Sequence, residues 1–351
     1  MKSAFSATKT ISLALFFVAS VAFGAKPKEA TAAADTTDLA EVVEQEDGKE
    51  FDAGAVILAH VMDDHQWHLT DHLVIPLPII VYSAEKGLDV FSSAHLYEHH
   101  KPVEYNGYIL KHHKIHLVDG GKEVLDLSIT KNVAMLLINA VLLVVVFFAV
   151  AKAYRQNKGK APSGLQSFIE PIIIFVRDEI VKPNIGHGYE KYFPYLLTLF
   201  FFVLFGNFLG LLPGSGNMTG NIAVTLVLAV LTFLITNLSG NASYWKHIFW
   251  TPGVPLPLRL VILPVEVIGI FTKPFSLTIR LFVAITAGHI VILSLIALAF
   301  IFGSYTVGLV SSLVAVFINV IELLVAGIQA YVFTLFTSLY IGMATAEDDH
   351  H

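Results

Sequence analysis

The chain has 351 residues, of which 55% are hydrophobic and only 14% charged, and its mean hydropathy is +0.68. Soluble globular domains carry about 25% charged residues, so this composition excludes that class and indicates an integral membrane protein. Cysteine is absent, which excludes disulfides and thiolate metal sites. The net charge of −6 is unevenly distributed, because the first third is acidic and rich in histidine and the remainder is apolar.

The pattern of residues 1–24 predicts a secretory signal peptide. Lys2 and Lys9 precede an apolar stretch at 11–23, and the small residues Ala22 and Gly24 are spaced for cleavage after residue 24. The alternative is an uncleaved first transmembrane helix, although this stretch is shorter than the ~20 residues that a span needs. With either interpretation, we expect the following residues to lie outside the cytoplasm.

Two exported segments are expected next. Residues 25–52 are rich in Ala, Thr, Asp and Glu, a composition typical of a disordered acidic linker. Residues 53–126 contain short apolar stretches broken by Pro, Gly and Asn, which predicts a small module of β character.

The exported module contains ten of the fifteen histidines. His65, His68 and His72 would share a face only in a helix, and neither cysteine nor a matching carboxylate pattern accompanies them. A solvated, pH-responsive surface is therefore favoured over a zinc site, although a zinc site stays open.

The first membrane span after the signal peptide is predicted at 132–151, a stretch of twenty uncharged residues rich in Leu, Val and Phe. Several cations follow it closely, and the positive-inside rule places them in the cytoplasm: Lys152, Arg155, Lys158 and Lys160. Residues 165–180 combine apolar residues at helical spacing with interspersed charges. This pattern predicts an amphipathic helix on the membrane surface or against a partner helix.

Four further spans are expected. The uncharged stretch 192–244 is divided by a turn at 213–221, so its length predicts spans at about 193–212 and 222–238. Two longer segments, about 258–302 and 307–343, exceed the ~20 residues needed to cross upright. We expect them to form a tilted or bent hairpin, with Pro264 and Pro274 as bend sites. The predicted fold class is an all-α polytopic membrane protein with five spans, comprising a membrane domain at 127–345 and a polar tail at 346–351.

Ionisable residues interrupt the first helix of this hairpin. Glu266, Lys273 and Arg280 are seven residues apart and share one face. A charge at the bilayer centre costs roughly 2.5–3.5 kcal/mol or more, which makes Arg280 a functional candidate. For Glu266 and Lys273, a structural ion pair or side chains that reach the cytoplasmic interface remain an equal alternative.

Counting residues from the turn at Ser304 estimates depth in the hairpin. By this count, His289 and Glu322 lie at a similar depth towards the outer side of the membrane. Arg280 and Gln329 lie at a similar depth further in. A histidine and a glutamate inside a bundle are typical of a proton relay.

The sequence contains no Walker loop, nucleophile elbow or HExxH motif, so an enzyme is not indicated. Asn207 and Gly210, inside the second span, favour close helix packing over chemistry.

At the residues of the hairpin the chain closely resembles subunit a of the F-type ATP synthase membrane sector. The matching stretches are 126–133, 206–213, 263–268, 273–282, 287–289 and 321–340. The resemblance covers roughly 126–345 and implies a non-catalytic stator subunit without a cofactor. With a ring of c subunits, such a subunit forms two offset half-channels for protons.

The resemblance also implies residue roles. Arg280 matches the essential arginine that faces the ring carboxylates, and Gln329 supports it. His289 and Glu322 match the polar pair of the outer half-channel, and Glu266 belongs to the inner one. Asn207, Ser276 and Lys273 are expected as supporting polar or packing residues. The family usually shows Gly-Asn after Arg-Leu-Phe, whereas this chain carries Val283-Ala284.

The expected partners are the c ring, the b-subunit stalk, the rest of the F1Fo complex, membrane lipid and the translocated proton, and no nucleic acid. The expected location is the bacterial inner membrane, with the mature N-terminus periplasmic and the C-terminus cytoplasmic. Two alternatives are a secondary transporter with a midplane arginine site for an anion and a periplasmic metal-handling protein with a passive anchor.

Overall fold

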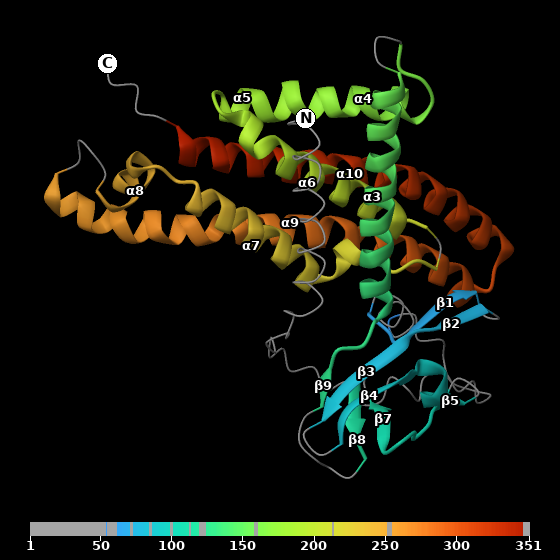
Figure 1. Ribbon diagram of the computed structural model, residues 1–351. Helices are drawn as coiled ribbons and strands as arrows, with labels where there is room; N and C mark the ends of the chain where they lie inside the picture. Colours follow the sequence, from blue (N-terminus) through green and yellow to red (C-terminus); the bar gives the residue numbers. More distant parts are fainter. Residues whose placement is uncertain are drawn as a thin grey trace.

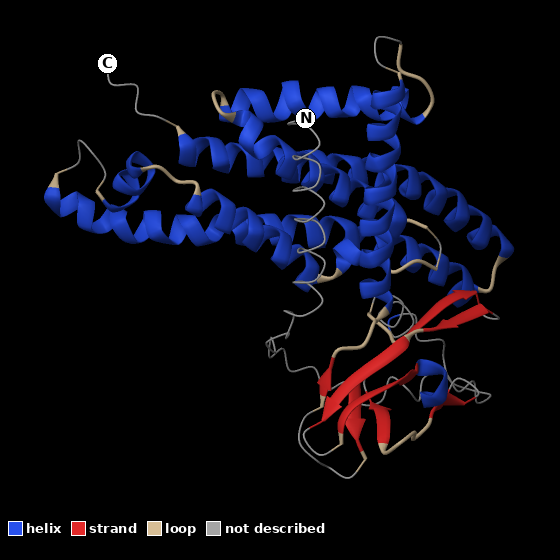
Figure 2. Ribbon diagram, in the orientation of Figure 1, coloured by secondary structure: helices blue, strands red, loops and turns tan. Residues whose placement is uncertain are grey.

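The computed structural model describes residues 54, 62–70, 73–83, 86–98, 101–111, 114–118, 124–157, 161–212, 214–250 and 255–346. The expected signal peptide, the acidic linker and most of the polar tail lie outside these residues. Within them, helices form one body and strands gather beside one end of it (Figures 1 and 2).

The described part of residues 53–126, called the β module below, consists of short antiparallel strands. The pairs are β1 (Gln66–Thr70) with β2 (Leu73–Pro76), β5 (Tyr97–Glu98) with β6 (Lys101–Pro102), and β7 (Tyr108–Lys111) with β8 (Lys114–Leu117). In a three-stranded sheet, β3 (Pro78–Ser83) lies between β4 (Gly87–Ser92) and β9 (Leu125–Asp126). Side chains alternate along β3, so that Ile79 and Val81 are buried with Leu96 and Tyr108 while Tyr82 is exposed.

Hydrogen bonds attach this module to the N-terminal end of α3 (Lys131–Gln156). The Asp63 carboxylate accepts hydrogen bonds from the backbone N–H of Asn132 at 3.0 Å and from the Thr130 hydroxyl at 2.8 Å. The Trp67 indole donates to the Gly214 carbonyl at 2.7 Å. The module therefore caps α3 and also contacts the loop that follows α6 (Tyr189–Gly210).

Four helices among the described residues are long and apolar enough to cross a membrane: α3, α6, α9 (Leu256–Phe302) and α10 (Tyr305–Thr345). The predicted span at 222–238 is the helix α7 (Ile222–Leu238), which has 17 residues and bends by 102° into α8 (Ala242–Phe249). Alone, α7 is too short to count as a candidate span, but α7 and α8 taken together are long and apolar enough. The described chain thus holds four to five candidate spans, because this segment turns after Leu238 and does not continue straight.

The predicted amphipathic segment is a continuous helical run of α4 (Leu165–Phe175), the π-helical turn η2 (Val176–Val181) and α5 (Lys182–Ile185). In η2 the Ile180 carbonyl accepts hydrogen bonds from Asn184 at 2.6 Å and from Ser338 of α10 at 3.2 Å. A π-turn displaces carbonyls from the regular α-helical pattern. Here the displacement lets α10 bond directly to the backbone of this segment.

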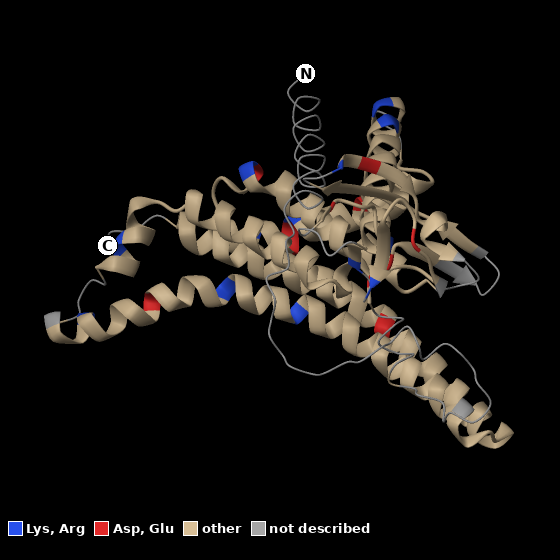
Figure 3. Cartoon of the chain, turned by 90° about the horizontal axis from the view of Figure 1, so that it is seen from below, with Lys and Arg blue, Asp and Glu red and all other residues tan. Residues whose placement is uncertain are grey.

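The pair α9 and α10 dominates the helical body (Figure 1). With 47 residues in α9, the helix is about 70 Å long at ~1.5 Å per residue, more than twice the ~30 Å hydrocarbon core. A helix of this length has to tilt or bend strongly to lie within a bilayer. Gly303 closes the helix with φ +54°, a left-handed conformation that favours glycine. Charged residues are sparse along the described helices (Figure 3).

Candidate functional site on the long helix pair

A histidine and a glutamate meet between the two long helices. His289 Nδ1 of α9 lies 3.6 Å from Glu322 Oε1 of α10, and the Glu322 side chain is only 3% exposed. The contact agrees with the count from the turn. Neither Glu322 oxygen accepts a hydrogen bond from the described residues. A buried carboxylate with so few partners is costly when ionised, so this group is suited to binding and releasing a proton.

The space for the Glu322 carboxylate is provided by Gly288, a residue whose role the sequence did not reveal. A β-carbon built on Gly288 would lie 2.6 Å from Glu322 Oε1 and 2.8 Å from its Cδ. Real β-carbons do not approach other atoms so closely, so any side chain at position 288 would displace the Glu322 carboxylate from its present position.

Arg280 is half-buried and packs against an aromatic ring. Its Cζ lies 4.2 Å from the centroid of Phe336 on α10, a cation–π geometry. The residue count placed Arg280 level with Gln329, but among the described residues no hydrogen bond joins the two. Side chains on a helix point towards its N-terminus, and the N-terminal part of α9 lies beside the later part of α10. Arg280 therefore contacts Phe336, a residue that sequence reasoning missed.

The Gln329 side chain is half-buried, and its Oε1 is buried without a hydrogen-bond partner in the described chain. Asn207 of α6 is fully buried and donates to the Ala326 carbonyl of α10 at 3.0 Å. This bond supports the packing role expected for Asn207. Ser276 is exposed on α9.

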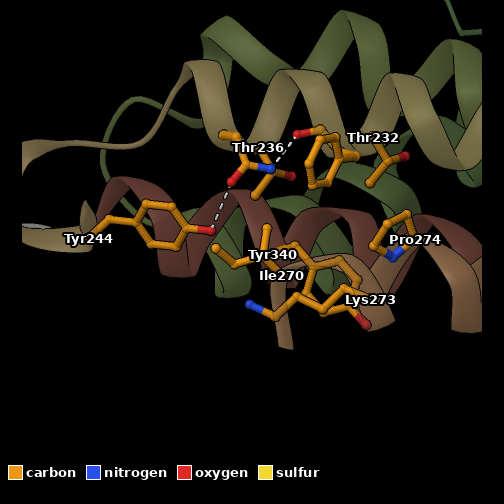
Figure 4. A pocket seen from close by; sticks show the side chains of 9 residues that line it. Thr232, Thr236, Tyr244, Ile270, Lys273, Pro274 and Tyr340 are labelled. Atoms are coloured by element: carbon orange, nitrogen blue, oxygen red, sulfur yellow. Dashed lines mark hydrogen bonds between the residues drawn. The ribbon is translucent and has the colours of Figure 1, made fainter. Parts of the chain in front are cut away.

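A second polar region surrounds Lys273 (Figure 4). A small pocket here lies between α7, α8, α9 and α10 and is lined by Thr232, Phe233, Thr236, Asn237, Tyr244, Ile270, Lys273, Pro274 and Tyr340. Lys273 Nζ lies 5.4 Å from the Tyr340 ring centroid. The Tyr244 hydroxyl donates to Asn237 Oδ1 at 3.2 Å.

Glu266 lies near this pocket and interacts electrostatically with both Lys273 and Tyr244. Among the described residues, no salt bridge within 4.0 Å joins Glu266 to Lys273. Their relationship is thus electrostatic proximity, not a direct ion pair. Tyr244 and Tyr340 were not found from the sequence, because they come from other helices.

The described histidines of the β module do not form a metal centre. His65 Nε2 lies 3.0 Å from Asp126 Oδ2, and within the described ranges no group of three His, Asp or Glu residues could hold a metal ion. The side chain of His68, and His72 as a whole, lie outside those ranges.

Comparison with known proteins identifies the helical part. The family model "ATP synthase A chain" matches residues 133–342. The chain belongs to this family. Its resemblance to subunit a of the F-type ATP synthase is thereby confirmed.

Relatives named "ATP synthase subunit a" or "ATP synthase subunit a 2" support the family assignment. The Chloroherpeton thalassium protein is 46% identical, over 64% of this chain and 69% of its own length. The Chlorobaculum tepidum protein is 48% identical, over 64% of this chain and 66% of its own length. The protein from Anaeromyxobacter sp. (strain Fw109-5) is 39% identical, over 87% of this chain and 74% of its own length. The alternative of a secondary transporter has no support from these comparisons.

A second family model, a domain of unknown function (DUF8433), matches residues 56–136. This range includes the strands of the β module and the first residues of α3. The match therefore overlaps the point where the module caps α3.

Proposed function

We propose that this chain is the stator subunit of the proton channel of an F-type ATP synthase, in which it loads and unloads the carboxylates of a c-subunit ring. The subunit does not itself catalyse ATP synthesis; it couples proton flow to rotation. The observation that carries the proposal is the family match over the two helices that hold the His289–Glu322 pair and Arg280.

Arg280 is proposed as the barrier between two half-channels. A guanidinium does not lose its proton in proteins, so it attracts a ring carboxylate in the ionised form and favours proton release. A carboxylic acid crosses lipid at lower cost when neutral. Each proton that crosses contributes ~2.3 kcal/mol per 100 mV of membrane potential. Contact with Phe336 supports a fixed position for the cation.

The two polar regions are proposed as the proton routes on either side of Arg280. His289 and Glu322 form the outer route, and Glu266 with the Lys273 pocket forms the inner one. Gln329, Asn207 and Ser276 are proposed as supporting residues along α6, α9 and α10.

The orientation and partners are also proposals. The cations that follow α3 favour a cytoplasmic location for its C-terminal end and an exported location for residues 53–126. The run α4–η2–α5 has exposed apolar side chains, among them Phe168, which supports a location at the membrane interface or against the b-subunit stalk. The proposed domains are a signal peptide at 1–24, a linker at 25–52, the module at 53–126, the membrane domain at 127–345 and the tail at 346–351.

Replacement of Arg280 tests the proposed function. In inverted membrane vesicles that contain the whole complex, Arg280→Ala is expected to abolish ATP-driven acidification while ATP hydrolysis by the soluble sector continues. Arg259→Ala is the matched control, because Arg259 lies on the same helix but stacks on Trp250, with its Cζ 4.0 Å from the ring centroid. Acidification at the wild-type rate in the Arg280→Ala vesicles would overturn the proposal.

A further inference from the structure

A groove lies between α9 and α10 beside the turn that joins them. Its volume is about 690 Å³, within the ~300–1,000 Å³ that is typical of ligand pockets. Small residues of both helices create it, among them Ala299 and Gly303 of α9 and Gly308 of α10. A β-carbon at Gly308 would lie 3.8 Å from that of Ala299, an ordinary contact distance. The two helices therefore approach each other here, and the missing side-chain volume leaves the groove beside their contact.

The wall of the groove on α10 carries hydroxyl groups that have no partner. None of them makes a hydrogen bond within the described chain: Ser304, Tyr305, Ser311 and Ser312. Elsewhere on the same two helices a hydroxyl donates to the carbonyl four residues earlier, as Ser294 does to Ile290 at 2.7 Å and Thr334 to Ala330 at 2.8 Å. Ser311 is only 5% exposed. A buried hydroxyl without a partner is costly, so an occupant with oxygen atoms that accept hydrogen bonds is favoured.

The wall on α9 and the rim of the groove are apolar. Among the described residues that line the groove, none is charged. Ile296 and Leu309 line it and are 45% and 65% exposed. Phe302 and Leu313, close to it on the two helices, are 62% and 65% exposed. In a membrane, such a rim is surrounded by lipid acyl chains, which are as apolar as leucine. The occupant is therefore expected to have an apolar chain as well as acceptor oxygens.

The groove lies at the level of a membrane surface. In Figure 1 the turn between α9 and α10 is level with the N-terminal end of α3, where the strands begin. Because α3 is long and apolar enough to cross a membrane, its end marks a surface of the bilayer. Tyr305, at the turn, is 99% exposed, and tyrosine is enriched where the hydrocarbon region meets the headgroups. This is the level at which the ester and phosphate oxygens of phospholipids lie.

The groove is turned away from the side of α9 that carries Arg280. At ~100° per residue, Gly303 and Ile296 are rotated by about 140° and 160° from Arg280 around the helix axis. In the proposed function Arg280 faces the c ring, so lipid and not the ring is the expected neighbour of the groove. Only this step rests on the proposed function.

We propose that the groove binds one phospholipid from the leaflet at this surface. One acyl chain lies along the apolar wall formed by α9, and the ester and phosphate oxygens accept hydrogen bonds from the hydroxyls of α10. These hydrogen bonds, together with contacts to two helices, distinguish this lipid from the lipid that surrounds any membrane helix. The site is separate from the proton routes, because none of the residues proposed for those routes lines it.

Photolabelling of the assembled complex tests the site. The complex is placed in vesicles of phosphatidylethanolamine and phosphatidylglycerol that contain phosphatidylcholine with a diazirine group in one acyl chain. After illumination, mass spectrometry measures the label on each residue of α10. Leu309 and Leu313 are a matched pair, because both are leucines with 65% exposure and only Leu309 lines the groove. We expect several-fold more label on Leu309, and equal labelling of the two would overturn the proposal.

Filling the groove is expected to displace the lipid. Ser312→Leu adds bulk to the lining and removes a hydroxyl, so the label on Leu309 should fall to that on Leu313. Ser294→Leu is the control, because it makes the same change at an exposed serine that does not line the groove. Labelling of Leu309 that persists in Ser312→Leu as it does in Ser294→Leu would contradict the site.

A second pair of variants keeps the test valid if Ser312→Leu fails to assemble. Ser312→Thr and Ser312→Val add nearly the same volume and differ in the hydroxyl. The excess label on Leu309 is expected to persist in the threonine variant and to be lost in the valine variant. Equal labelling of Leu309 in both would show that the hydroxyl does not bind the lipid.

Other occupants give a different result. Water or a ring subunit in the groove would exclude the acyl chain, so Leu309 would carry less label than Leu313, and the proposal would fail. Arg280→Ala is expected to leave the labelling unchanged, because Arg280 does not line the groove. A failure of the lipid site is thus distinguishable from a failure of the proposed function, which is measured by acidification.

Discussion

The Glu322 carboxylate lies so close to Gly288 that a β-carbon at residue 288 would be 2.6 Å from its Oε1. The same carboxylate faces the next residue, His289, at 3.6 Å. The glycine therefore sets the position of Glu322 relative to its histidine partner. A proton relay depends on such spacing, because proton transfer requires hydrogen-bond reach, direct or through one water.

We predict that Gly288→Ala slows proton translocation without preventing assembly. Overpacking costs about 1–3 kcal/mol, and ~1.4 kcal/mol corresponds to a tenfold change in rate, so ATP-driven acidification in inverted vesicles should fall about tenfold. Gly269→Ala on the same helix is the control, since its β-carbon would meet nothing within 4 Å. Equal rates in the two variants would show that the clearance at residue 288 does not matter.

Phe336→Leu should weaken coupling while preserving most of the buried volume. The change removes the aromatic face under Arg280, a contact of about 0.5–2 kcal/mol, so the guanidinium becomes less confined. We expect fewer protons pumped per ATP hydrolysed. The comparison variant is Phe317→Leu, because Phe317 lies on the same helix and is 65% exposed. A pumping ratio identical to that of Phe317→Leu would rule out a role for the ring.

Gly342→Ala is expected to destabilise the contact between α5 and α10. A β-carbon at residue 342 would collide with the backbone carbonyl of Asn184, and a backbone atom cannot move aside as a side chain can. We expect a loss of about 1–3 kcal/mol, seen as a lower yield of assembled complex and a lower Tm. Gly327→Ala, with open space around its β-carbon, should leave both unchanged, and a Gly342→Ala complex as stable as that control would contradict the packing argument.

The β module should lose stability in acid through Asp126. Burial raises the pKa of this carboxyl, but hydrogen bonds from His65 and Ser128 outweigh burial and leave the pKa below its ordinary value of 3.8. The group thus stabilises the folded module above about pH 3.8, and this contribution is lost as pH falls through the lowered pKa.

Limited proteolysis of the full chain in membranes over a pH series measures this loss. Wild-type resistance is expected to fall below about pH 3.8. The Asp126→Asn variant should be less resistant near neutral pH and change less in acid. The same acid-dependent fall in the variant would exclude Asp126 as its cause.

Much of the membrane architecture could be predicted from the sequence. Long uncharged segments have to be helical in a bilayer, because their backbone groups have no other partners there. The positions of the charged residues were equally informative. A charged side chain inside the bilayer costs free energy, so each one in an apolar segment indicates a candidate functional residue. A count of residues from the turn was enough to bring His289 and Glu322 together. The helix predicted at 222–238 has the same bounds in the structure, but the 102° bend into α8 that follows it could not be predicted, because local hydropathy does not report such a bend.

Only the tertiary structure decided which side chains complete the site. Gly288 belongs to the site because the Glu322 carboxylate of α10 lies against it. Phe336 belongs to it because the Arg280 side chain points towards the N-terminal end of α9 and so reaches the Phe336 ring. Periodicity defines the faces of one helix, whereas contacts between helices depend on their crossing and on side-chain direction. For this reason the sequence determined where the charges lie, and the packing of α3, α6, α9 and α10 determined what each of them can reach.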